Sequence, residues 1–117
     1  MAEIQAYRPD NLPDMSKLFS WGLRVAKFEE LYFITGLADM ADDGSGARFP
    51  GNPVAQTETV LERMDQFIRE AGFERDHIIR MEWTFRKDVR ETDYAGIYAA
   101  WEAFVAPMKI KPAGGTL

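Results

Sequence analysis

One short segment alternates strictly between apolar and polar side chains, and this pattern restricts the fold more than any other feature of the chain. Its apolar members are Ile79, Met81, Trp83 and Phe85, and between and after them stand Arg80, Glu82, Thr84 and Arg86. A period of two is that of a β-strand with one buried face and one face toward solvent or a partner. The chain is therefore expected to contain a sheet that is covered on at least one side.

Two segments of helical periodicity flank this strand. In the first, Asn52 is a candidate N-cap, Pro53 is the first helical residue, and Gly72 ends the helix. The second helix is predicted to open near Thr92 or Asp93 and to close at Pro107. Its apolar positions recur at steps of three and four, and they are Tyr94, Ile97, Tyr98, Trp101, Phe104 and Val105.

The remaining segments are predicted as follows. Residues 1–15 carry two prolines and loop-forming residues, so an irregular arm is expected before a single domain of residues 16–117. Residues 17–28 look extended, and residues 31–37 form an apolar, β-branched run, which together predict a hairpin that turns near Lys27 to Glu30. Met108 to Leu117 returns to extended chain. The expected order is β-β-α-β-α-β, a two-layer α+β domain.

Composition restricts the class of protein and its partners. A chain of 117 residues with 46% hydrophobic and 28% charged residues suits one globular domain. The net charge is -5 and the basic residues are scattered, which argues against nucleic acid as a partner. Cysteine is absent, and neither a secretory signal nor a membrane-spanning run is visible. We therefore expect a cytoplasmic protein without a membrane partner.

The order and spacing of four segments resemble those of the RidA (YjgF) family, the reactive-intermediate imine deaminases. The similarity extends from about Leu18 to Leu117. Its carriers are the run Leu31-Tyr32-Phe33-Ile34-Thr35-Gly36, the helix from Val54 to Gly72, the strand from Ile79 to Asp88, and Trp101-Glu102-Ala103-Phe104. The resemblance implies a chorismate-mutase-like fold, a barrel-like homotrimer, a small-molecule ligand in clefts between subunits, and no cofactor. It also implies hydrolysis of an imine or enamine to a 2-oxo acid and ammonia.

The C-terminal segment departs from the family pattern at one position. The family has Pro-x-Arg followed by Ser or Thr; here Pro112 and Thr116 match, whereas Gly114 stands in the place of the arginine. An arginine fork holds a carboxylate in a bidentate geometry that glycine cannot supply. In the family a further strand bears a glutamate, so we expect this C-terminal strand to be missing and the natural chain to continue past Leu117.

Six residues are candidates for ligand binding by the same resemblance. Phe19 stands in the place of a family tyrosine, Thr35 in that of a serine before Gly36, and Tyr98 in that of an asparagine. The set is Phe19, Thr35, Gly36, Tyr98, Gly114 and Thr116.

Structural explanations remain open for two of these candidates, and a replacement for the arginine remains open as well. Thr35 also suits the end of a strand, and Gly114 also suits either a close backbone approach or room for a bulkier ligand. Lys109, Lys111 or Arg24 could supply the missing cation. No metal site is expected, because the single histidine, His77, has no partners at ligand spacing.

Two functions follow from these observations. The first is a RidA-like small-molecule-binding protein without archetypal imine deaminase activity, with its ligand in the intersubunit clefts. The alternative is a hydrolase or deaminase of the same superfamily that acts on an enamine, an imine or a related small metabolite. The sequence leaves open whether the protein is an enzyme.

Overall fold

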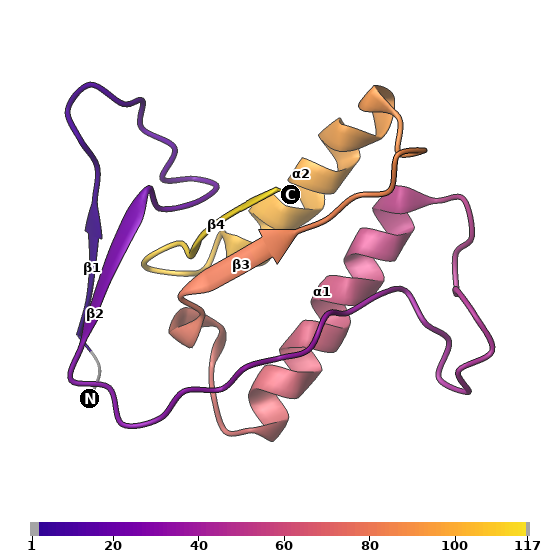
Figure 1. Ribbon diagram of the computed structural model, residues 1–117, viewed down its shortest axis with the longest axis horizontal. Helices are drawn as coiled ribbons and strands as arrows, with labels where there is room; N and C mark the ends of the chain where they lie inside the picture. The colour runs from indigo at the N-terminus through magenta and orange to yellow at the C-terminus, as the bar shows by residue number, and fades with distance from the viewer. Residues whose placement is uncertain (1–2, 117) are drawn as a thin grey trace.

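The computed structural model describes residues 3–116, and within them the chain forms two helices and two small sheets (Figure 1). In chain order the elements are β1 (Glu3–Tyr7), β2 (Gly22–Ala26), α1 (Pro53–Glu70), the 3-10 turn η1 (Arg75–His77), β3 (Arg80–Trp83), the 3-10 turn η2 (Glu91–Asp93), α2 (Tyr94–Val105) and β4 (Ala113–Thr116). Strands β1 and β2 pair antiparallel, and β3 and β4 pair parallel. The α+β class is confirmed; the topology differs from the expected one at the N-terminal end.

Helix α1 begins and ends where the sequence predicts. The Asn52 side chain accepts a hydrogen bond from the Ala55 N–H at 3.1 Å, and Pro53 occupies the first turn. Gly72 has φ 84°, a left-handed conformation that glycine adopts without strain and that redirects the chain. The buried apolar side chains of the helix are Leu61, Met64 and Ile68, so the predicted stripe faces the core.

Helix α2 packs closely on α1 because it carries a glycine at the contact. A Cβ at Gly96 would lie 2.7 Å from Val54 Cγ2, so the two backbones approach further than larger residues would permit. The core lies between the helices and β3, where Met81 and Trp83 pack against it. Its buried residues are Leu61, Met64, Ile68, Trp101, Phe104, Val105 and Met108.

Strand β3 confirms the alternation that the sequence shows. Met81 and Trp83 are half-buried, whereas Arg80 and Glu82 are exposed on the other face, where they form an ion pair with each other. Helix α2 connects β3 to β4, and the two strands pair in parallel from Arg80 opposite Ala113 to Trp83 opposite Thr116. This β-α-β unit carries the site described below.

Two expectations for the N-terminal part were wrong. Glu3–Tyr7, expected to be irregular, forms β1 and pairs with β2 from Glu3 opposite Ala26. The predicted hairpin near Lys27 to Glu30 does not form: β2 pairs with β1, and residues 31–37 do not pair with β2. Lys27 has φ 56°, and the chain leaves the strand there.

The apolar run of residues 31–37 is not part of a sheet in the described chain. Residues 31–37 make no backbone–backbone hydrogen bond within residues 3–116. Ile34 and Leu37 pack against the core, whereas Leu31, Tyr32 and Phe33 are exposed, Phe33 by 85%. An apolar segment with free backbone groups is therefore presented to the outside.

The chain is more extended and exposes more surface than a compact monomer of its size. Its radius of gyration is 15.2 Å, against roughly 13 Å for a compact domain of this length. Its accessible surface is 8574 Å², against roughly 6,500 Å² for a typical monomer of this mass. Figure 1 shows one source of this difference, since the β1–β2 ribbon stands to one side of the helices.

No helix within residues 3–116 combines the length and the apolar character needed to cross a membrane.

Candidate functional site

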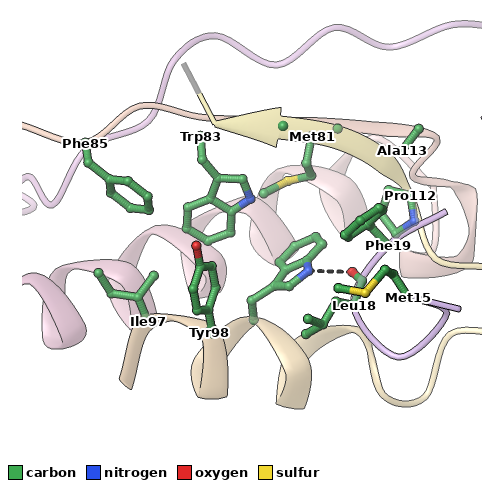
Figure 2. A pocket seen from close by; sticks show the side chains of 13 residues that line it. Met15, Leu18, Phe19, Met81, Trp83, Phe85, Ile97, Tyr98, Pro112 and Ala113 are labelled. Carbon is green, nitrogen blue, oxygen red and sulfur yellow. Dashed lines mark hydrogen bonds between the residues drawn. The ribbon is translucent and has the colours of Figure 1, made fainter. Parts of the chain in front are cut away.

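A cavity of about 440 Å³ lies between the β3–β4 pair and helix α2. Figure 2 shows its side chains converging from the strands above and from the helix below. The lining residues are Met15, Leu18, Phe19, Met81, Trp83, Phe85, Ile97, Tyr98, Trp101, Pro112, Ala113, Gly114 and Gly115. Small-molecule sites in proteins have this size and this predominantly apolar, aromatic lining.

The alternation of β3 and the helical periodicity of α2 place the central side chains. Met81 and Trp83 point from the strand toward α2, and Tyr98 points back from the helix (Figure 2). The Trp83 and Trp101 rings meet edge to face with centroids 5.4 Å apart. This geometry is favourable for aromatic pairs and fixes the orientation of both indoles.

The segment before β2 forms one end wall of the cavity. The Trp101 Nε1–H donates to the Leu18 carbonyl at 2.7 Å, and the dashed line in Figure 2 marks this bond. The Ser20 N–H donates to the Pro112 carbonyl at 3.1 Å, and the Ser20 hydroxyl donates to the Lys111 carbonyl at 2.5 Å. These bonds hold residues 15–20 against α2 and the segment that leads into β4.

Sequence reasoning missed Met15 and Leu18 as cavity residues. Met15 ends the predicted irregular arm and Leu18 begins the segment predicted to be extended. The position of this segment depends on hydrogen bonds to residues about 90 positions later in the chain. The sequence carries no local signal of such contacts.

No charged side chain lines the cavity within the described part of the chain. Lys111 Nζ donates to the Met108 carbonyl at 2.7 Å, and Lys109 and Arg24 are exposed. None of the three candidates for replacing the family arginine is among the lining residues. A ligand carboxylate would thus enter an apolar space without a countercharge, which is costly.

Gly114 lies against the backbone of the neighbouring strand. A Cβ built at Gly114 would overlap the Met81 carbonyl oxygen and would lie 2.8 Å from the Met81 carbonyl carbon. Even an alanine would therefore require a backbone shift, and an arginine could not be added to β4 as it stands. Of the two open explanations, the close backbone approach is confirmed. The glycine also lines the cavity, so the space it leaves belongs to the site.

No protein-family model matches the sequence, and no curated protein shows significant similarity to it. The structure, in contrast, is similar to a solved one. YyfB from Yersinia pestis, a protein of unknown function of the conserved Rid protein family, matches with a TM-score of 0.79 at 20% sequence identity; the match covers 97% of this chain and 85% of that chain. The chain has the Rid-family fold.

On this Rid fold, the six predicted site residues fall into two groups. Phe19, Tyr98 and Gly114 line the cavity together. Thr35 and Gly36 belong to the exposed run of residues 31–37 and do not line it. The backbone of Thr116 lies in β4 opposite Trp83. That these residues bind a ligand stays a prediction, and Leu117 lies outside the described residues.

A second hollow of the Rid fold lies on the outer side of the two helices. Its floor is formed by Leu61 and Phe104, with the Arg75 guanidinium 4.0 Å from the centroid of the Phe104 ring. The Asp65 carboxylate forms an ion pair with the Arg75 guanidinium at 3.2 Å, so the two opposite charges balance each other. Residues 3–116 contain no group of three or more histidine, cysteine or acidic residues that could hold a metal ion.

Proposed function

We propose that this chain is a divergent member of the RidA superfamily that binds a small, uncharged, largely apolar molecule in the β3–β4/α2 cavity and lacks archetypal imine deaminase activity. The observation that carries the proposal is the lining itself. Among the described residues it contains five aromatic side chains and, apart from the Tyr98 hydroxyl, no ionisable group. Such a wall offers contact area to a neutral ligand and no partner to a carboxylate.

The absence of an arginine at position 114 supports the proposed lack of imine deaminase activity. The family reaction depends on a positioned substrate carboxylate, and positioning contributes a large share of rate enhancement. Here position 114 is a glycine, and the Met81 backbone beside it leaves no room for a side chain. An enzyme acting on another small metabolite remains the alternative, and Tyr98 is then the available acid–base group in the described lining.

We also propose that the protein is a homotrimer, because a single chain exposes more surface than a typical monomer does. The chain exposes roughly 2,000 Å² more than a typical monomer of its mass, and specific protein interfaces bury about this much in total. The exposed run of residues 31–37 and the Arg80–Glu82 face of β3 are the surfaces that partner subunits would cover. The expected intersubunit position of the ligand stays a prediction. The described cavity is lined by one chain, with Tyr98, 51% exposed, at its open side.

Binding of a neutral fluorescent probe tests the function. We expect N-phenyl-1-naphthylamine to show saturable fluorescence enhancement with the protein. Tyr98→Ala should weaken binding about two- to tenfold, the value of one aromatic contact. Tyr7→Ala, which removes a tyrosine of similar exposure on β1, serves as the matched control and should leave binding unchanged. Absence of saturable binding, or equal binding by Tyr98→Ala and the control, would contradict the proposal.

We also expect the protein to act in the cytoplasm. The sequence has no cysteine, so the fold does not depend on an oxidising compartment. Localisation of a tagged full-length chain by microscopy and fractionation would check this.

A further inference from the structure

The three tryptophans differ in how their indole N–H groups are used. Trp21 Nε1–H donates to the Pro13 carbonyl at 2.8 Å, and Trp101 Nε1–H donates to the Leu18 carbonyl at 2.7 Å. For Trp83, which lines the cavity, the indole N–H forms no hydrogen bond within the described part of the chain. A half-buried indole donor normally finds a partner, so the free N–H of Trp83 requires an explanation.

The Trp83 nitrogen is not sealed inside the protein. Among the residues that the structure describes, Asp39 Oδ1 is the one fully buried side-chain oxygen or nitrogen without a partner. Trp83 Nε1 therefore keeps accessible surface. Figure 2 shows this nitrogen on the edge of the ring that faces the Met81 side chain, within the group of lining residues. A molecule in the cavity can reach it.

We infer, on the basis of the proposed function, that the ligand carries a hydrogen-bond acceptor that receives the Trp83 Nε1–H. An indole nitrogen can only donate, so the matching group is an acceptor. The acceptor is uncharged, because no cation lines the cavity to balance an anion. The ligand class is thus a neutral aromatic or otherwise planar molecule with a carbonyl oxygen, such as a ketone, lactone or amide.

The rest of the lining agrees with a flat body for this ligand. The walls are aromatic on the strand side, with Trp83 and Phe85 centroids 6.0 Å apart, and on the helix side, with Tyr98. Such rings favour offset stacking or edge contacts with another ring. Tyr98 is 51% exposed, and Figure 2 shows its hydroxyl directed toward Trp83. This hydroxyl can donate or accept, so it suits a second polar group on the ligand.

Three naphthalenes of nearly equal size test separately the effect of a hydrogen-bond acceptor and the effect of a charge on ligand affinity. They are 2-acetylnaphthalene with a neutral acceptor, 2-ethylnaphthalene without one, and 2-naphthoate with a charge. Their affinities are measured by displacement of N-phenyl-1-naphthylamine from the full chain. We expect the ketone to bind roughly fivefold tighter than the hydrocarbon, as one net hydrogen bond predicts, and naphthoate to bind weakest.

The decisive reading is the ratio of ketone to hydrocarbon affinity in Trp83→Phe. This variant keeps an aromatic ring and removes the donor, so the ratio should fall by roughly fivefold, while the hydrocarbon affinity shows that the cavity is intact. Trp21→Phe, whose indole donates elsewhere, is the matched control and should keep the wild-type ratio. An unchanged ratio in Trp83→Phe overturns the inference and leaves the proposed function standing. Failure of every naphthalene to displace the probe contradicts both.

Discussion

Gly114 and Met81 form the closest approach between β4 and β3, because a side chain at position 114 would overlap the Met81 carbonyl oxygen. Because Gly114 also lines the cavity, this contact determines which side chains the site can contain. In the resembled family the same position carries the arginine that grips the substrate. Here the strand pairing leaves no room for a side chain at position 114.

Gly114→Ala should destabilise the protein by about 1–3 kcal/mol, the usual cost of forcing extra atoms into a packed site. Gly115→Ala is the matched control, since a Cβ there has no neighbour within 4 Å, and its effect should stay within about 0.5 kcal/mol. Chemical denaturation of both variants gives the comparison. Equal stability of the two would show that β3 and β4 lie farther apart than described.

Met64→Ala should cost about 2–5 kcal/mol of unfolding free energy, because Met64 is buried between the helices and its removal leaves a cavity. Phe67→Ala on the same helix is the control, since Phe67 is 38% exposed, and it should cost clearly less. Thermal or urea unfolding measures both. A smaller loss for Met64→Ala than for Phe67→Ala would mean that the buried face of α1 is misassigned.

The helices could be predicted from the sequence because their signals are local. The Asn52 cap, the left-handed Gly72 and the apolar stripe between them lie within one segment, and the structure places the cap and the glycine as expected. Of the predicted stripe, Leu61, Met64 and Ile68 are buried, whereas Phe67 is 38% exposed. The partner of β2 could not be predicted in this way. Whether β2 pairs with the chain before it or after it depends on competition between distant strands. Lys27 also adopts a positive φ, which a lysine in the sequence does not predict.

The candidate site was predictable only where the resemblance supplied it. Phe19, Tyr98 and Gly114 were named and do line one cavity. Met15 and Leu18 were not, because long-range bonds from the Trp101 indole N–H to the Leu18 carbonyl and from the Ser20 hydroxyl to the Lys111 carbonyl hold this segment there. The alternating pattern predicted that Trp83 faces the core, and its ring does pack there. The pattern does not predict whether the indole nitrogen has a hydrogen-bond partner.

Sedimentation should give a particle of about three times the chain mass of 13.4 kDa, because the run of residues 31–37 and the open face of β3 need a cover. Phe33→Glu, at a position that is 85% exposed, should shift the assembly toward monomer by placing a charge in the expected interface. Phe28→Glu is the control on a neighbouring exposed site. A well-folded monomer for the wild-type chain would contradict the proposed trimer.

Asp14 should titrate at a lower pH than an ordinary aspartate. Hydrogen bonds from the Ser16 hydroxyl and then from its backbone N–H, the latter at 3.0 Å, lower the pKa of this carboxyl. Because the folded-state pKa is depressed, the stabilising contribution is present above the unfolded-state pKa and is lost as the pH falls through the folded-state value.

Carbon-detected NMR titration of the carboxyl groups measures this shift. Ser16→Ala should raise the pKa of Asp14 toward its ordinary value. Asp43, whose pKa Ser45 lowers in the same manner, should stay low in that variant and is the internal control. A titration of Asp14 that Ser16→Ala leaves unchanged would show that the turn before Leu18 is not held by this contact.

The most direct test of the account is release of ammonia from freshly generated 2-iminobutyrate, followed in a coupled assay with purified full-length protein. We expect a rate equal to the spontaneous one, because no cation among the described residues lines the cavity to hold the substrate carboxylate, and position 114 has no room for an arginine side chain. Protein-dependent hydrolysis well above the spontaneous rate would contradict it, and would mean that a cation such as Lys109, Lys111 or Arg24 reaches the substrate.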